Sequence, residues 1–508
     1  MKFIWNKPSL AIAFLVTFAL NAAFAQLTVT SLLSDHAVVQ RCNSIHVWGV
    51  ALPHEQVDAT FHEQSAKTNA DEYGYWSMWL APEQAGGPYV LTVSSEKSKQ
   101  KITRTDILVG DVWFASGQSN MVFPMTGFGN APLKNGAQEL AQAAHPSIRL
   151  FLQKRRVSDV VLHDTDDEWK ICDPESAKTF SAVAYFFGRD LSAAENVPIG
   201  LIDASWGGTP AHSWISLTGI AVANLPSIAA DAGDIAEQQG RVAEIRSLYS
   251  TRKGKERDLL PDPKHIGVDS RGAWIPGSLF NGMIAPFTQY PIKGVIWYQG
   301  ETDTFPQRAS DYQRVLSALI LDWRRQWNQG PFPFLIVQIS SYGSGAAPTR
   351  NNEWGEVRDA QRRVTDETAH TALAMTLDIG SITTVHPPDK QEVGRRLALL
   401  ARKHVYGENI AADSPTFLRA RPENSVMHVW FDHAQGLHLS QTGISDFEVA
   451  GENHRFFPAT ARVDGETILV RSDSVPRPMY VRYGWKAVAS ESILNSADLP
   501  ASTFTSEY

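Results

Sequence analysis

The feature that most constrains the fold is an alternation, between residues 106 and 407, of short apolar runs with segments of helical periodicity. The runs predict strands at residues 107–115, 199–204, 294–298, 334–339 and 372–377. Between the third and fourth runs, Tyr312, Val315, Leu319 and Trp323 recur at the spacing of one helix face. Strands that alternate with helices form βαβ units, whose strands pair in parallel. We therefore predict an α/β domain around a parallel sheet.

The segments on either side are predicted to be β-rich modules. Residues 26–105 alternate short apolar stretches with turn residues, which is typical of a small β-sandwich, and residues 412–508 return to the same pattern. A chain of 508 residues is also too long for one compact domain. The expected domains are therefore 26–105, 106–411 and 412–508.

Residues 1–25 have the pattern of a secretory signal peptide. Lys2 and Lys7 come before an apolar run at 10–20, and Ala23-Phe24-Ala25 follows that run. The run is shorter than the roughly 20 apolar residues that span a bilayer. We expect cleavage before Gln26 and an exported protein, periplasmic or secreted, with no membrane anchor after cleavage.

Charge and cysteine content exclude several classes of partner and site. The net charge is −8 and no long basic stripe is present, so nucleic acid is not an expected partner. Cys42 and Cys172 fall in different predicted domains, so a disulfide is possible in an oxidising compartment but is not expected. No CxxC pair or Cys/His cluster has the spacing of a zinc site.

The first chemical motif follows the strand predicted at 107–115. It reads Gly117-Gln118-Ser119-Asn120-Met121. A strand that breaks at glycine into a helix start would leave the Ser119 hydroxyl at the carboxyl edge of the sheet, near N–H groups that favour negative charge. Ser119 is therefore a candidate nucleophile. The alternative is that Ser119 is the N-cap of the helix. The motif is also not a G-x-S-x-G nucleophile elbow, because Met121 occupies the place of the second glycine.

Three further groups come at or after other predicted strand ends. Trp206-Gly207-Gly208-Thr209 follows the strand at 199–204, where glycines allow a ligand to approach the backbone or simply make a tight turn. Gln299 directly follows the strand at 294–298, and its amide could donate to a developing oxyanion. His386 precedes a helix and could take a serine proton near neutral pH. Because all belong to one predicted sheet, we expect them to converge.

These blocks, with Trp297-Tyr298-Gln299-Gly300-Glu301 as the third, resemble in order those of the SGNH-hydrolase branch typified by sialate O-acetylesterase. Further landmarks of that branch are Leu33-Ser34-Asp35-His36, Asn281-Gly282-Met283-Ile284-Ala285-Pro286, Lys390-Gln391 and Val481-Arg482-Tyr483-Gly484-Trp485. The resemblance implies a flavodoxin-like three-layer α/β/α core and a carbohydrate O-acetylesterase that needs no metal or organic cofactor.

The resemblance also implies roles for individual residues. Ser119 would attack the acetyl carbonyl to form an acetyl-enzyme, and His386 would relay the proton. The oxyanion donors would be the N–H groups of Ser119 and Gly207 and the side chain of Gln299.

One departure from the family leaves the third member of the triad open. Thr383 and Thr384 stand where many SGNH enzymes have an aspartate before the histidine. Glu301 and Asp378 are our candidates for orienting His386. A Ser-His dyad that uses a backbone carbonyl is equally tenable.

The sugar also stays open. The resemblance allows O-acetylated sialic acid or an acetylated plant polysaccharide such as xyloglucan or xylan. Trp206 and Trp214 could stack on sugar rings, although most tryptophans are expected in the core. His212 stands where relatives often have an acidic residue, which bears on substrate choice. The alternative function is an exported, non-catalytic glycan-binding protein with an inert core. The sequence predicts no oligomeric state.

Overall fold

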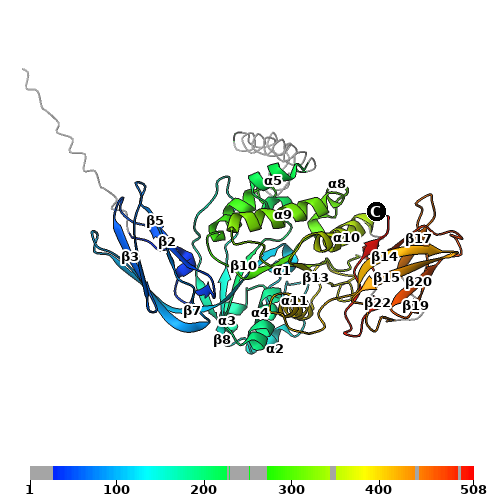
Figure 1. Ribbon diagram of the computed structural model, residues 1–508, viewed down its shortest axis with the longest axis horizontal. Coiled ribbons are helices and arrows are strands. Elements are labelled where there is room, and N and C mark those ends of the chain that lie inside the picture. The colour runs from blue at the N-terminus through cyan, green and yellow to red at the C-terminus, as the bar shows by residue number, and fades with distance from the viewer. Residues whose placement is uncertain are drawn as a thin grey trace, which may run out of the picture.

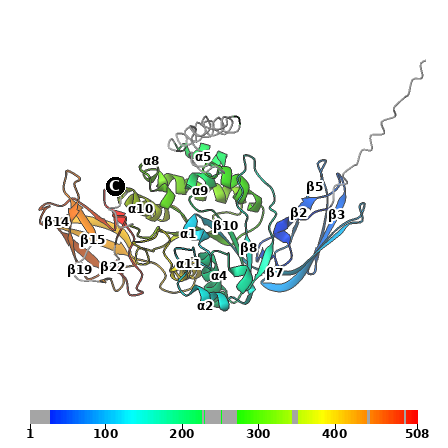
Figure 2. The same ribbon diagram turned by 180° about the vertical axis from the view of Figure 1, so that it is seen from behind.

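The computed structural model describes residues 27–225, 228, 251, 272–343, 351–440, 446–489 and 493–507. An α/β core lies between two β modules (Figures 1 and 2). The predicted signal peptide at 1–25 lies outside the described residues. Within these residues, no helix is both long and apolar enough to cross a membrane.

The core is built on a sheet with the strand order β13-β12-β11-β7-β10-β8-β9. All these pairings are parallel except the one between β8 and β9. From β7 the chain first builds β8 to β10 on one side and then β11 to β13 on the other, so the order reverses at β7. Ligands of open α/β sheets bind at the carboxyl ends of the strands next to such a reversal. The strands are β7 (Lys101–Gly117), β8 (His145–Leu152), β9 (Trp169–Cys172), β10 (Ile199–Ser205), β11 (Gly294–Tyr298), β12 (Phe334–Val337) and β13 (Thr371–Ala374).

Helices cover both faces of this sheet (Figure 1). Alternate residues of β7 belong to two separate cores: Trp113 and Ala115 pack with α4 and α11, whereas Val112 and Phe114 pack with α9 and α10. The predicted three-layer α/β/α core is therefore confirmed. The helices are α1 (Ser119–Val122), α2 (Gly136–Ala141), α3 (Pro174–Ala177), α4 (Ala182–Glu195), α5 (Leu217–Ala223), α8 (Pro306–Ala309), α9 (Tyr312–Trp327), α10 (Asn351–Glu367) and α11 (Lys390–His404).

Strand β7 joins the N-terminal module to the core. Its first part pairs with β6 and its last part with β10 and β11, so both units share one eleven-stranded sheet. The predicted boundary between residues 105 and 106 therefore falls inside a continuous strand. The boundary predicted between 411 and 412 lies in the loop that follows α11.

Both flanking β modules that the sequence predicts are present. The N-terminal module contains β1 (Val38–Gln40), β2 (Ile45–Val50), β3 (Gln56–Phe61), β4 (Gln64–Asn69), β5 (Tyr75–Leu80) and β6 (Gly86–Ser95). The C-terminal module has its own core between two sheets with the orders β14-β15-β20-β19 and β18-β17-β21-β23. Its strands are β14 (Thr416–Glu423), β15 (Val426–Asp432), β16 (His438–Leu439), β17 (Phe447–Ala450), β18 (Phe457–Pro458), β19 (Thr460–Asp464), β20 (Thr467–Arg471), β21 (Tyr480–Tyr483), β22 (Ile493–Leu494) and β23 (Phe504–Thr505). Cys42 and Cys172 are both free thiols.

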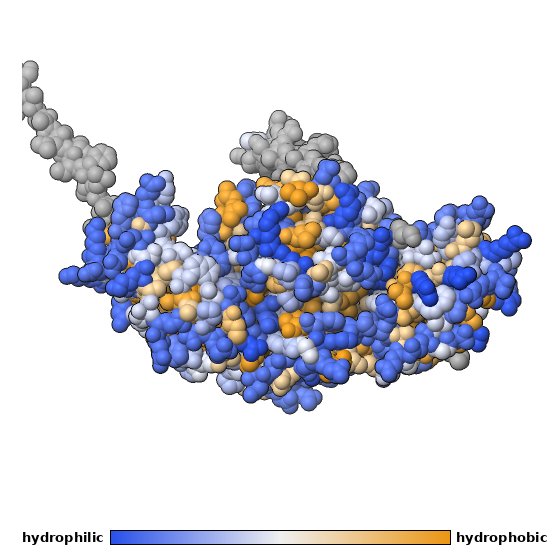
Figure 3. Space-filling model, viewed as in Figure 1, coloured by the Kyte–Doolittle hydropathy of each residue, from blue (hydrophilic) through white to orange (hydrophobic). Residues whose placement is uncertain are grey.

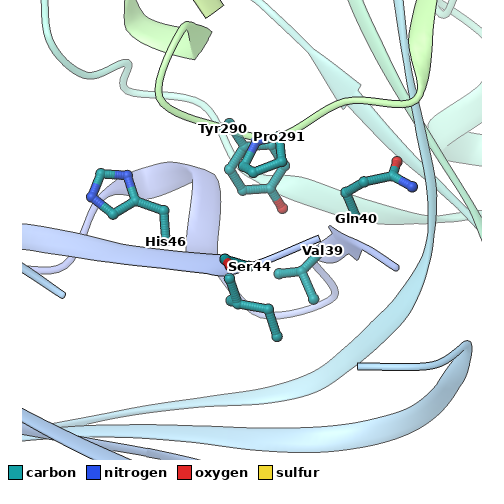
Figure 4. Close-up of a pocket in the computed structure, with 7 residues that line it drawn as sticks. Val39, Gln40, Ser44, His46, Tyr290 and Pro291 are labelled. Carbon is teal, nitrogen blue, oxygen red and sulfur yellow. The ribbon is translucent and has the colours of Figure 1, made fainter. Parts of the chain in front are cut away.

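A small pocket lies at the junction between the N-terminal module and the core (Figure 4). Beside it, the Tyr290 hydroxyl donates to the Val38 carbonyl at 2.6 Å, and the His46 ring is 3.2 Å from the Gln289 carbonyl. These bonds fasten the two units together, and none of the predicted site residues lines the pocket. Elsewhere, hydrophobic surface gathers over α5 and α9 (Figure 3).

Candidate active site

Ser119 lies where β7 turns into α1, at the carboxyl end of the sheet. Gly117 makes the turn possible, because its φ is 137° and a Cβ there would lie 2.1 Å from the Tyr298 carbonyl oxygen. The N-cap of α1 is Gln118, and Ser119 is the first residue of the helix. The alternative reading of Ser119 as an N-cap is therefore wrong. Ser119 is half-buried, so solvent can reach it.

The backbone of Gly207 borders Ser119. The Trp206 N–H donates to the Gly117 carbonyl at 3.0 Å, which ties the end of β10 to the end of β7. A Cβ built on Gly207 would lie only 3.1 Å from the Ser119 Cβ. Gly207 is half-buried and Gly208 is exposed. The glycine block thus brings the backbone close to the serine, and the approach of a ligand to this backbone stays a prediction.

His386 lies in the loop between β13 and α11, beside α1. The carbonyl of its neighbour Val385 accepts a 3.0 Å hydrogen bond from Asn120 Nδ2, and the His386 ring meets the Phe128 ring edge-on at 4.9 Å between centroids. In the part of the chain that the structure describes, no hydrogen bond joins Ser119 to His386. Catalytic hydrogen bonds are often long in unliganded enzymes and tighten around substrate. Burial, reinforced by the positive charge of Lys390, lowers the pKa of His386.

A buried polar cluster of Asn120, Glu301 and Lys390, here the Asn120 cluster, underlies the serine and histidine segments. Asn120 Nδ2 donates to Glu301 Oε1 at 2.5 Å, and Lys390 Nζ donates to Asn120 Oδ1 at 2.6 Å. Burial raises the pKa of Glu301 and lowers that of Lys390 to about 7, the latter against the pull of the Glu301 charge. The sequence assigned no role to Asn120 or Lys390, although both lie within the quoted blocks.

Asp378 is paired with Arg396 rather than with His386. Both of its carboxylate oxygens are bound by the Arg396 guanidinium, one of them at 2.6 Å, and Arg396 also donates to the Met375 carbonyl. Arg396 is buried on α11, where its charge is paired with Asp378 and also with Glu392, 2.7 Å from Nε. In this structure Asp378 pairs with Arg396 and not with His386, and its role as the orienting acid stays a prediction. Among the described residues, no carboxylate is hydrogen-bonded to the His386 ring.

The Gln299 amide is already engaged. Its Nε2 donates to the Thr209 carbonyl at 3.1 Å and to the Asp303 carboxylate, while its Oε1 accepts from the Tyr312 hydroxyl at 2.9 Å. An amide nitrogen has two N–H donors, and both are used here. A role for Gln299 as an oxyanion donor stays a prediction, and it requires one of these bonds to be exchanged.

The three residues predicted to contact the sugar, Trp206, Trp214 and His212, are all buried. Trp214 has no exposed surface and donates through Nε1 to Thr209 Oγ1 at 3.0 Å, so it belongs to the core and the prediction for it is wrong. Trp206 and His212 are also buried, at 4% and 2% exposure. The His212 ring is hydrogen-bonded to the Trp274 carbonyl at 3.0 Å, which fits a supporting role.

An aromatic edge that the sequence did not single out lies beside the glycine block. The Trp274 indole N–H donates to the Gly208 carbonyl at 2.7 Å, and the Arg308 guanidinium lies 4.6 Å from the Trp274 ring centroid. Phe305, 42% exposed, lies 5.8 Å from the same guanidinium. Trp274 falls outside all four sequence blocks, so no pattern distinguished it from a core tryptophan.

Comparisons with known proteins show similarity to carbohydrate esterases. Residues 266–402 match the family described as carbohydrate esterase, sialic acid-specific acetylesterase. Sialate O-acetylesterase of Rattus norvegicus is 28% identical over 471 residues, which cover 85% of this chain and 84% of that protein. The Pongo abelii sialate O-acetylesterase is 30% identical over 406 residues, covering 73% and 69%.

A solved structure extends the similarity to the whole architecture. The crystal structure of a novel carbohydrate acetylesterase from Xanthomonas citri superposes with a TM-score of 0.80 at 32% identity, covering 94% of this chain and 99% of that one. Its coverage includes the flanking β modules as well as the core. This chain therefore belongs to the sialate O-acetylesterase family of carbohydrate esterases.

Proposed function

We propose that this protein is an exported carbohydrate O-acetylesterase that removes acetyl groups from sugars through Ser119. The observation that carries the proposal is the juxtaposition at the carboxyl edge of the sheet. The Gly207 backbone lies so near Ser119 that a Cβ on Gly207 would be 3.1 Å from the Ser119 Cβ, and the His386 loop is hydrogen-bonded to the residue next to Ser119. Membership of the family supports the esterase class, and the site supplies the residues for a serine mechanism.

In this mechanism Ser119 Oγ attacks the acetyl carbonyl carbon and its proton passes to the His386 ring. The N–H groups of Ser119 and Gly207 would donate to the oxyanion of the tetrahedral intermediate. His386 then protonates the sugar oxygen as the C–O bond breaks, which leaves an acetyl group on Ser119. Water, deprotonated by His386, releases acetate and regenerates the serine. The lowered pKa of His386 suits it to act as a base near neutral pH.

The substrate we propose is an acetylated sugar that stacks on the aromatic edge beside Gly208. Trp274 is partly exposed there and Phe305 more so, and an aromatic ring offers a flat apolar face with little conformational entropy to lose. O-acetylated sialic acid, acetylated xyloglucan and acetylated xylan all have an acetyl ester on a sugar. The names of the relatives support a carbohydrate acetate, and the choice among these sugars is left to experiment.

The test is acetate release by the protein without residues 1–25, from acetylated xyloglucan, acetylated xylan and 9-O-acetyl sialic acid in parallel. Ser119→Ala should reduce turnover of the preferred substrate by about a thousandfold or more, because the nucleophile is lost. Ser116→Ala, a nearby serine on β7 whose hydroxyl donates to the Ala204 carbonyl, should keep turnover. Glycan binding without any acetate release would favour the non-catalytic glycan-binding function instead.

A further inference from the structure

We propose that Lys390 is a positioning residue of this active site. Its ammonium group holds Asn120, the neighbour of the nucleophile, in the orientation that joins the Ser119 helix to the His386 loop. The inference deepens the proposed function and rests on it.

The environment of Lys390 is unusual for a lysine. It is the first residue of α11, it has no exposed surface, and Nζ lies 2.6 Å from Asn120 Oδ1. The faces of the Phe123 and Tyr298 rings enclose the ammonium, with centroids at 4.9 and 5.3 Å. Lysine is rarely buried unless it is paired, because its charge loses the water around it. Burial lowers the pKa of Lys390 to about 7, so the side chain is an ammonium below that pH, with Asn120 Oδ1 as its hydrogen-bond acceptor.

The charge decides which way the Asn120 amide points. An ammonium can only donate, so it selects the amide oxygen. The amide nitrogen then faces Glu301 Oε1 and the Val385 carbonyl, and it donates to both, at 2.5 and 3.0 Å. One amide therefore ties the residue after Ser119 to the residue before His386. Without Lys390 the amide oxygen would lose its donor, and this tie would lose the constraint that orients it.

Lys390 also acts on His386 through its charge. The two residues are four positions apart, and the positive charge of Lys390 disfavours the imidazolium form, which adds to the effect of burial on the pKa of His386. The other charged groups around Lys390 are Glu301 from the segment after β11 and Asp389 at the N-cap of α11. Asp389 is itself paired with Lys134, 2.6 Å away.

The test compares Lys390→Met, which keeps the length but removes the charge, with Lys134→Met as a matched control near the same helix end. The readout is the rate at which a fluorophosphonate probe labels Ser119, measured against pH, together with kcat/KM for acetate release and the Tm. We expect Lys390→Met to slow labelling at least tenfold, the scale of loss when a reacting group is misplaced. We also expect the acid limb of the labelling profile to move to higher pH, because the pKa of His386 rises.

Lys134→Met should change neither quantity. Lys390→Arg keeps the charge, so the position of its acid limb should match the parent even if its larger side chain lowers the rate. Unchanged labelling in Lys390→Met would overturn the inference. A lower Tm and slower labelling with an unmoved limb would also overturn it, because the role would then be merely structural.

Two further arms keep the result interpretable. If Lys390→Met does not fold, Lys390→Gln takes its place, since it retains an N–H donor without the charge and should still move the limb. The parent protein separates the two proposals. If its Ser119 is not labelled, the serine mechanism itself fails. If Ser119 is labelled but no sugar acetate is cleaved, only the substrate class fails, and the comparison of lysine variants still stands.

Discussion

At the scale of single residues, the site depends on how little space surrounds Ser119. Gly117 and Gly207 each stand where a side chain would meet the neighbouring strand end or the serine itself. The polar residues beneath are equally constrained, because Asn120 has no exposed surface and its amide oxygen and nitrogen both have partners. A side chain at Gly117 would clash with the backbone and destabilise the fold, whereas a small one at Gly207 should alter chemistry more than stability.

Gly207→Ala tests the close approach. The added Cβ would lie 3.1 Å from the Ser119 Cβ, so the serine or the loop must shift by a few tenths of an ångström. We expect kcat/KM for acetate release to fall by about tenfold to a hundredfold, with little change in Tm. Gly129→Ala, where a Cβ meets nothing within 4 Å, is the control. Full activity in Gly207→Ala would argue against an oxyanion donor at this position.

Asp378→Asn and Glu301→Gln distinguish the roles of the two candidate orienting carboxylates. Asp378→Asn removes one of the two carboxylates that pair with the buried Arg396, and Glu392, 2.7 Å from Arg396 Nε, remains. We expect a loss of about 1.5–3 kcal/mol in unfolding free energy, the range for hydrogen bonds to a charged group, and a kcat within threefold of the parent. Glu301→Gln should reduce kcat at least tenfold, because the Asn120 cluster loses its negative charge. Denaturant unfolding and acetate release measure both. If the Asp378→Asn protein is folded but inactive, the result would indicate that Asp378 is the acid that orients His386.

The pH dependence of the reaction follows from His386. Only the neutral ring accepts the serine proton, so kcat/KM should rise with pH as His386 deprotonates. Because burial and Lys390 lower its pKa, this limb should lie below the ordinary imidazole value of about 6.5. A pH profile of kcat/KM with substrate well below KM checks the position. A limb above the ordinary value would mean that a nearby carboxylate stabilises the imidazolium.

At the scale of elements, α11 couples the site to the sheet. Its N-cap Asp389 accepts from the Glu392 N–H at 3.2 Å, and the next residue is Lys390. The helix then packs along α4, where Gly394 lets the two backbones come close. The start of α11 is thus determined by a local cap, and this start places the buried lysine.

Asp389→Ala removes this cap. We expect it to lower the unfolding free energy by about 1 kcal/mol, as for other N-cap losses, whereas Asp389→Ser keeps a capping oxygen and should recover most of it. Urea denaturation followed by circular dichroism measures both variants. If Asp389→Ser is no more stable than Asp389→Ala, the contribution of Asp389 comes from its ion pair with Lys134 rather than from the cap.

At the scale of the whole molecule, the C-terminal module is attached to the core by a buried arginine. Arg358 on α10 has no exposed surface, and its guanidinium donates to the carbonyls of Gly484, Lys486 and Ala487 at 2.8, 3.1 and 2.7 Å. Burial lowers its pKa to about 9, which still leaves it charged at neutral pH. The module is therefore an integral part of the fold.

Arg358→Met should uncouple this attachment. Three carbonyls lose a charged donor, and hydrogen bonds to charged groups contribute about 1.5–3 kcal/mol each. We expect calorimetry to show two unfolding transitions, the lower one from the C-terminal module, where the parent shows one. Arg421→Met, at an exposed position on β14, is the control. A single, unshifted transition in Arg358→Met would contradict this coupling.

The sequence by itself determined the features that depend on neighbouring residues. Apolar periodicity located β10 and β11 to within a residue, and glycines at strand ends marked Gly117 and Gly207. Parallel strands share a carboxyl edge, so the gathering of Ser119 and Gly207 there followed from local patterns alone. The predicted strand at 107–115 was shorter than β7 because its extra length comes from pairing with the N-terminal module, which no local pattern shows.

Only the tertiary structure decided what depends on distant partners. The burial of Trp214 and the pairing of Asp378 with Arg396 are properties of packing between elements, so the sequence could not show either of them. The contact between Asn120 and Lys390 spans 270 positions of the chain. A residue's type states which bonds it can make, but the folded chain decides which partner lies within reach, and a buried polar group binds whichever one that is.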